Sequence, residues 1–218
     1  MMGFAKKTSM LCASIGAALL FAVPAAVGAS GTSTATTYCT GPTDPGTVIL
    51  GNLKAGPGCF LQLTTVKGNV TVVQGGSLDT FSSEIDGNVT SSNATRVDIS
   101  LFTDVHGNVV IEGSTESAGL GRANVDGNVV LVGNAGLIGM SLVGVGGNLQ
   151  VTHSSLSFPG FLSEIFVSGN VDISNNTGQI DISDSTITKN LICNNNQPPV
   201  IASDNTAKKK LGECAVET

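Results

Sequence analysis

The chain of 218 residues has no tryptophan and a single tyrosine, Tyr38, and aromatic residues make up only 4% of it. Charged residues are also scarce, at 12%. Large aromatic side chains contribute heavily to the core of an ordinary globular domain, so their scarcity argues against a core of that kind. Glycine is abundant instead, with 28 residues, and Ser, Thr, Asn and Val recur throughout. This composition favours thin, stacked β-layers.

Basic residues are few, with 10 Lys and Arg against 16 Asp and Glu. Removal of residues 1–29 would take away Lys6 and Lys7 and no acid, leaving eight basic and 16 acidic side chains, a net charge of −8. Affinity for nucleic acid comes mainly from Lys and Arg that neutralise phosphates, so we expect no nucleic-acid partner. The one basic run, Lys208–Lys210, is interpreted as part of a solvated tail.

Residues 1–29 have the three parts of a signal peptide. Lys6 and Lys7 precede an apolar run over 10–23, and small residues follow over 25–29. The apolar run is shorter than the roughly 20 residues that a spanning helix needs. We therefore predict cleavage after Ala29 and a secreted, extracellular protein. Because no second long apolar run follows, we expect no membrane span in the mature chain.

The strongest signal is a five-residue unit, V-x-G-N-V, which recurs seven times at intervals of about 20 residues. Apolar residues alternate after each unit, as in a half-buried strand. No copy could bury its inner face alone, so the copies must stack. The units are Val66–Val70, Ile85–Val89, Val105–Val109, Val125–Val129, Val145–Leu149, Val167–Val171 and Ile187–Leu191.

This repeat predicts an all-β fold, a single-stranded parallel β-helix (β-solenoid) of about 20-residue coils, which we expect to be right-handed. A β-sandwich is the alternative, but it would not explain a Gly-Asn pair once per coil. We predict a signal peptide over 1–29, an N-terminal extension over 30–45, the repeat domain over 46–206 and a C-terminal cap or tail over 207–218.

The Gly-Asn pair suits a sharp corner, since glycine tolerates positive φ and Asn can bond to neighbouring backbone. Asparagines stacked at one corner would form an internal ladder of amides. The competing interpretation is a row of asparagines that binds a ligand, and we favour the structural role. The predicted ladder comprises Asn69, Asn88, Asn108, Asn128, Asn148, Asn170 and Asn190.

Four cysteines follow the leader, and three pairings are possible for them. Cys39 and Cys59 are 20 residues apart and Cys193 and Cys214 are 21 apart, each about one coil. Coils stack at about 4.8 Å, which a disulfide can bridge. We predict the pairs Cys39–Cys59 and Cys193–Cys214, one at each end of the solenoid, and an oxidising compartment.

The chain resembles secreted bacterial repeat proteins, frequent in actinobacteria, that carry a leader, V-x-G-N-V units and a cysteine-bracketed tail. The segment 58–61, the seven units and the ending from Cys193 to Cys214 carry the resemblance. It implies the fold and export only, because that family has no assigned activity. Lys189 in place of glycine and one 22-residue copy depart from its pattern.

One column of turn residues holds candidate metal ligands. Stacking would place Asp86, His106 and Asp126 in a line, with Glu84 and Asp104 nearby. Such a row could raise the pKa of His106 or bind a divalent cation. The alternative is a solvated turn column, which we favour because metal ligands converge on a point whereas an exposed row diverges. We predict no cofactor.

No catalytic constellation emerges from the sequence, since the histidines are isolated and coil lengths vary little. We therefore expect a non-enzymatic module with a structural or surface and matrix role. Its partner would be a cell-envelope polymer, a glycan or a second copy of the chain. The alternative is a polysaccharide lyase or hydrolase, because β-helices can carry clustered carboxylates in a cleft.

Overall fold

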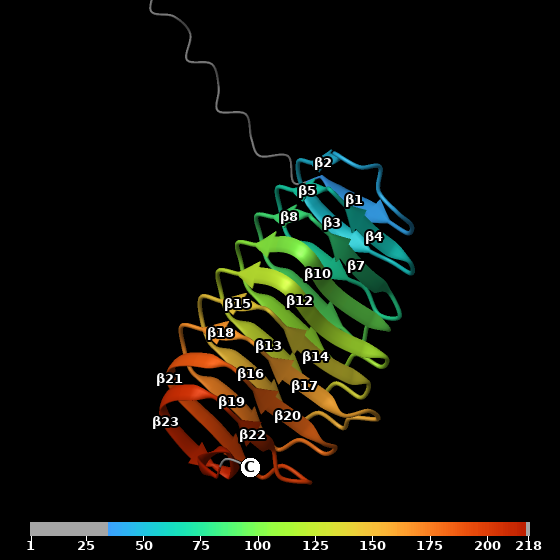
Figure 1. Ribbon diagram of the computed structural model, residues 1–218. Coiled ribbons are helices and arrows are strands. Elements are labelled where there is room, and N and C mark those ends of the chain that lie inside the picture. Colours follow the sequence, from blue (N-terminus) through green and yellow to red (C-terminus); the bar gives the residue numbers. More distant parts are fainter. Residues whose placement is uncertain (1–34, 217–218) are drawn as a thin grey trace, which may run out of the picture. The chain divides into compact units, whose positions relative to one another are not determined.

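The computed structural model describes residues 35–216, which form an all-β solenoid of about nine turns (Figure 1). All strand pairs are parallel, and the described residues contain no α-helix, only one 3-10 turn, η1, at Glu213–Ala215. The predicted fold class is confirmed. No helix in this part of the chain is long and apolar enough to cross a membrane. Residues 1–29, the predicted signal peptide, lie outside the described residues.

Each coil contributes a strand to each of three faces, within which the strands are parallel, and we call these faces A, B and C in chain order. Four strands bend around a corner and serve two faces: β10 (Arg96–Val105), β12 (Ser117–Val125), β21 (Thr186–Asn194) and β23 (Thr206–Gly212). Face A holds parts of these four and β2 (Val48–Ile49), β5 (Thr65–Val66), β8 (Glu84–Ile85), β15 (Gly144–Val145) and β18 (Phe166–Val167).

Face B begins after the Gly-Asn turn, and face C begins after the next corner. Face B holds β1 (Thr36–Cys39), β3 (Asn52–Ala55), β6 (Val70–Val72), β9 (Val89–Ser92), β11 (Val109–Glu112), β13 (Val129–Val132), β16 (Leu149–Thr152), β19 (Val171–Ser174) and the ends of β21 and β23. Face C holds β4 (Cys59–Gln62), β7 (Ser77–Phe81), the starts of β10 and β12, β14 (Leu137–Ser141), β17 (Gly160–Ser163), β20 (Ile180–Ser183) and β22 (Ile201–Ser203).

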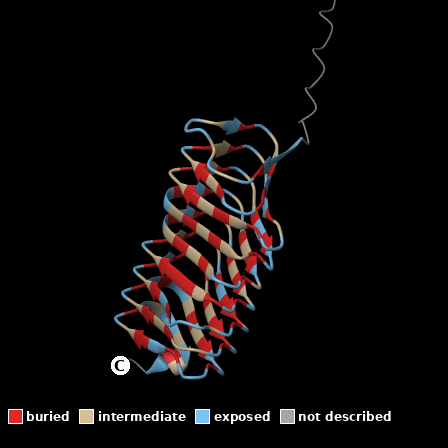
Figure 2. Cartoon of the chain, turned by 90° about the vertical axis from the view of Figure 1, so that its right-hand side faces the viewer, coloured by how far each residue is buried: buried red, intermediate tan, exposed pale blue. Residues whose placement is uncertain are grey.

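Alternate residues of each strand point inward and stack in columns, which appear as buried stripes in Figure 2. The apolar residue after each repeat asparagine is fully or almost fully buried, and burial of each such side chain contributes roughly 1.5–3 kcal/mol. This column comprises Leu53, Val70, Val89, Val109, Val129, Leu149, Val171 and Leu191. Stacking therefore supplies the core that no single coil could make.

The asparagine ladder exists and starts one coil earlier than predicted, at Asn52. Each asparagine donates its backbone N–H and its Nδ2 to Oδ1 of the preceding asparagine, over 2.8–3.2 Å and 3.1–3.3 Å respectively. The prediction of an internal ladder is wrong, because these side chains are exposed or half-buried at an outer corner.

The glycines of the Gly-Asn turns are needed for close packing between coils, not for positive φ as predicted. None of them has a positive φ. A Cβ at Gly87 would lie 2.6 Å from Gly68 O and 2.7 Å from Asn69 Oδ1 of the preceding coil. A side chain would therefore push two coils apart.

Positive φ angles occur instead at the other two corners of each coil. Asn93, Gly113, Gly133 and His153 adopt them between faces B and C, and Arg122 is one of those between faces C and A. After the first of these corners the chain buries a ladder of polar residues that the repeat unit did not predict. Its members are Ser114, Asn134, Ser154, Asn176 and Asn196.

Both predicted disulfides are present, with Cα–Cα distances of 5.2 Å for Cys39–Cys59 and 5.4 Å for Cys193–Cys214. Neither disulfide joins two residues that lie opposite each other in a strand pair, since Cys39 is opposite Ala55 and Cys193 is opposite Gly212. Each therefore ties a terminal strand to a neighbouring part of the coil.

The solenoid extends beyond the predicted repeat domain of residues 46–206. β1 lies within the predicted extension, residues 30–45, and pairs with β3. β23 continues into the predicted tail, residues 207–218, and pairs with β21. These two strands lack the V-x-G-N-V unit, so the repeat alone placed the boundaries too far inward. Glu213 then caps the buried ladder by accepting bonds from Asn196 N and Nδ2 over 2.9 and 2.8 Å.

Candidate functional site

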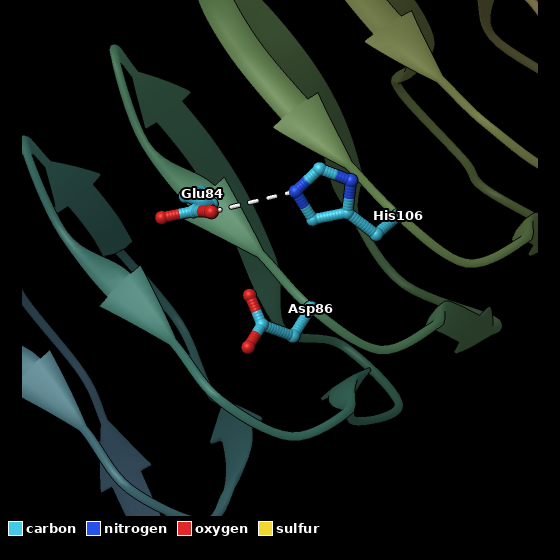
Figure 3. Close-up of side chains that lie close together, drawn as sticks. All are labelled: Glu84, Asp86 and His106. Carbon is cyan, nitrogen blue, oxygen red and sulfur yellow. Dashed lines mark hydrogen bonds and ion pairs between the residues drawn. The ribbon is translucent and has the colours of Figure 1, made fainter.

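The predicted row of turn residues forms a polar cluster on the outer side of face A. His106 follows β10, and its Nδ1 lies 2.8 Å from Asp126 Oδ2 of the next coil. Its Nε2 lies 3.4 Å from Glu84 Oε1 of the preceding coil (Figure 3). The hydrogen bond to Asp126, then that to Glu84, raises the pKa of His106 above its usual 6.5. The imidazole thus connects three coils.

The structure brings together a different set of ligand atoms from the predicted one. Glu84, Asp86 and His106 each offer an atom within 4.8 Å of the others. Asp126 contacts the other imidazole nitrogen, so it lies outside this set. Asp104 is also separate, because it accepts a bond from Asn124 Nδ2 over 2.9 Å. As expected for an exposed row, Asp126 lies away from this set of ligand atoms. Glu84 joins the set because it belongs to the same coil as Asp86.

A second site, which the sequence did not single out, is a hollow on face C. The outward column here runs through Asp79, Asp98, Gly119, Gly139 and Phe161 in adjacent coils. Two glycines in succession leave a gap in the layer of side chains. The resulting hollow has a volume of about 360 Å³.

A carboxylate and an aromatic ring lean into this gap from opposite ends. A Cβ on Gly119 would lie 2.5 Å from Asp98 Oδ1, and a Cβ on Gly139 would lie 2.8 Å from Phe161 Cζ. Ser117 and Ser141 add hydroxyl groups to the lining. The hollow therefore combines an anionic end, an apolar end and a glycine floor.

The two carboxylates at the anionic end are in different environments. Asp79 forms a close ion pair with Arg96 Nη2, while Arg96 Nε lies 3.5 Å from Asp98 Oδ2. Asp98 also accepts a bond from Ser117 Oγ over 3.1 Å. Burial raises the pKa of Asp98 above its usual 3.8, and the Ser117 bond opposes that effect. The Asp79 ion pair and the Asp98 burial thus distinguish two neighbouring acids.

The asparagine ladder forms one wall of a shallow trough along face B, about 690 Å³ in volume. Thr71, Thr90, Val110 and Val130 line the rest of it. Each inner asparagine uses Oδ1 for two bonds to the next coil, which leaves little of its acceptor capacity for a ligand. The structural interpretation of these asparagines fits this bonding.

The face C residues could have been found by aligning whole coils. Asp79, Asp98, Gly119, Gly139 and Phe161 are spaced by 19 to 22 residues, the same interval as the repeat. They lie outside the V-x-G-N-V unit, and their identities vary, so no motif marks them. No protein-family model, curated protein or solved structure matches this chain.

Proposed function

We propose that this protein is a secreted, non-enzymatic solenoid that binds a glycan of the extracellular matrix or cell envelope in the hollow on face C. The observation that carries the proposal is the interruption of one outward column by Gly119 and Gly139, between the Asp98 carboxylate and the Phe161 ring. In the other described coils a side chain occupies this position, as at Phe60, Asp181 and Ile201.

The lining of the hollow matches the chemistry of a sugar ring. A pyranose presents C–H groups on its faces and hydroxyl groups around its edge. The exposed Phe161 ring offers an apolar platform, while Asp98 and the serine hydroxyls can accept or donate hydrogen bonds. Small-ligand pockets are roughly 300–1,000 Å³, so a hollow of about 360 Å³ suits one or two sugar rings.

Export and rigidity support a role outside the cell. Disulfides persist in oxidising compartments, and one ties down each end of the solenoid. The predicted leader and the resemblance to secreted actinobacterial repeat proteins agree with this location. A stiff stack of coils also holds the hollow in a fixed shape, which limits the ordering cost of binding.

The test is co-sedimentation of residues 30–218 with insoluble chitin, cellulose and peptidoglycan. We expect binding to at least one of them and a loss of at least tenfold in affinity for Phe161→Ala. Phe166→Ala is the matched control, because Phe166 is similarly exposed, at 52% against 44% for Phe161, but lies on face A. Binding to none of these glycans, or equal binding by both variants, would overturn the proposal.

A glycan-cleaving activity is the second candidate, and one observation favours it. Asp98, with its raised pKa, could donate a proton, and the neighbouring Asp79 forms an ion pair with Arg96. An assay for new reducing or unsaturated ends on pectin, alginate, hyaluronan and any bound glycan separates the two functions. Products that disappear in Asp98→Asn would establish the enzyme, whereas binding without products supports the non-enzymatic module.

A further inference from the structure

The cluster around His106 on the outer surface is not part of the proposed glycan site. It lies on face A and the glycan hollow lies on face C, so the experiment on one proposed site does not decide the other. Three potential ligands meet here, an imidazole and two carboxylates, from two adjacent coils (Figure 3).

We propose that Glu84, Asp86 and His106 form a binding site for a divalent transition metal, with Zn²⁺ as the best fit. His106 offers Nε2, and each acid offers one carboxylate oxygen. Their ligand atoms lie within 4.8 Å of one another. Tetrahedral ligands at Zn²⁺ distances are about 3.4 Å apart, so small rotations of exposed side chains complete the site.

The contact on the far side of the imidazole supports this assignment. Asp126 Oδ2 lies 2.8 Å from His106 Nδ1, so it can accept a hydrogen bond from the proton on that nitrogen when the imidazole is neutral. A metal that displaces the proton on Nε2 would then meet a lone pair on the side that faces Glu84. Histidines that bind metals usually donate their other N–H to a carboxylate or carbonyl in this way. The predicted ligand Asp126 therefore acts as a positioning residue.

Charge and ligand type select the class of metal. Glu84 and Asp86 carry two negative charges against one nearby cation, since Lys67 Nζ lies 3.2 Å from Asp86 Oδ2. A divalent ion would neutralise the pair and displace Lys67. An imidazole ligand favours Zn²⁺, Cu²⁺ or Ni²⁺ over Ca²⁺ and Mg²⁺, which prefer oxygen ligands. The fourth position would be open to water.

The experiment is isothermal titration of residues 30–218 with ZnSO4 and, in parallel, with CaCl2. We expect one Zn²⁺ per chain and at least 100-fold weaker binding of Ca²⁺. His106→Ala should abolish Zn²⁺ binding, and Asp126→Asn should weaken it by about 10- to 100-fold, as loss of a carboxylate partner does elsewhere. His153→Ala, which removes the other exposed histidine, should leave it unchanged.

One variant moves binding in the opposite direction. Lys67→Met removes the cation that competes for Asp86 and should tighten Zn²⁺ binding by severalfold. Circular dichroism of each variant verifies folding, and NMR of the imidazole locates the metal at Nε2. The proposal is overturned if millimolar Zn²⁺ gives no heat and no imidazole shift, or if His106→Ala and His153→Ala weaken binding equally. Glycan binding measured with EDTA present is expected to be unaffected.

Discussion

Replacement of Ser91 by valine should stabilise the solenoid. Ser91 points into the core from β9, between Val72 and Ile111 of the adjacent coils, and is only 5% exposed. Its hydroxyl is buried, and no hydrogen-bond partner for it lies among the described residues. An unsatisfied buried polar group costs about 1–3 kcal/mol, and each added buried methyl group contributes about 0.8 kcal/mol.

Some of that gain is offset by imperfect packing of the larger side chain, so we expect a net stabilisation of about 1–2 kcal/mol. For a chain of this size that is about 2–8 °C in Tm, measured by thermal unfolding followed by circular dichroism. Ser92→Val is the control, because Ser92 points outward and should change Tm little. An unchanged or lower Tm for Ser91→Val would refute the placement of Ser91 in the apolar column.

Three further predictions concern the buried ladder, the coil spacing and the face C acid. Asn176→Ala should lower the free energy of unfolding, measured by chemical denaturation, by about 2–4 kcal/mol, because it leaves buried backbone groups unpaired. Asn148→Ala on the outer ladder should lower it by under about 1 kcal/mol, because water replaces the lost bonds. Gly136→Ala should cost at least about 2 kcal/mol, since its Cβ would meet a backbone oxygen at 1.9 Å, while Gly133→Asn, with a positive φ and open space, should be near neutral in the same assay. The carboxyl group of Asp98 should titrate above 3.8 in NMR, because burial raises its pKa in the folded state. The charged form therefore destabilises the fold above that pKa, so Asp98→Asn should be more stable than the parent protein at neutral pH, and this difference in stability should fade as the pH falls toward 3.8. A difference that grows on acidification would contradict the burial of Asp98.

The sequence predicted the fold because the same unit recurs seven times at an interval of about 20 residues. The interval between asparagines defined the coil, and the same interval between cysteines identified both disulfides. It could not distinguish why glycine precedes each asparagine. Positive φ and close approach of a neighbouring coil both demand glycine. The structure separates the two reasons, because Gly87 has no positive φ and a Cβ on it would lie 2.6 Å from Gly68 O.

The buried ladder and the hollow escaped prediction for a related reason. Asn176 and Ser154 occupy one column, but Ser and Asn are frequent throughout the chain, so their alternation carried no signal. The hollow depends on side chains that are absent from a column, at Gly119 and Gly139. The cluster around His106 was predicted in part. Asp86 and His106 lie close together, and Asp126 contacts the other imidazole nitrogen. Glu84 is the third potential ligand because it lies two residues before Asp86 in the same coil.

The most direct test of the proposed glycan site is to locate the bound sugar. Amide NMR spectra of residues 30–218 would be recorded during titration with a soluble oligosaccharide of the glycan that sediments the protein. The proposed site predicts shifts concentrated in residues 117–121, 137–141 and 161–163, on face C. Shifts concentrated in the asparagine trough of face B, or confined to the terminal coils, would contradict it.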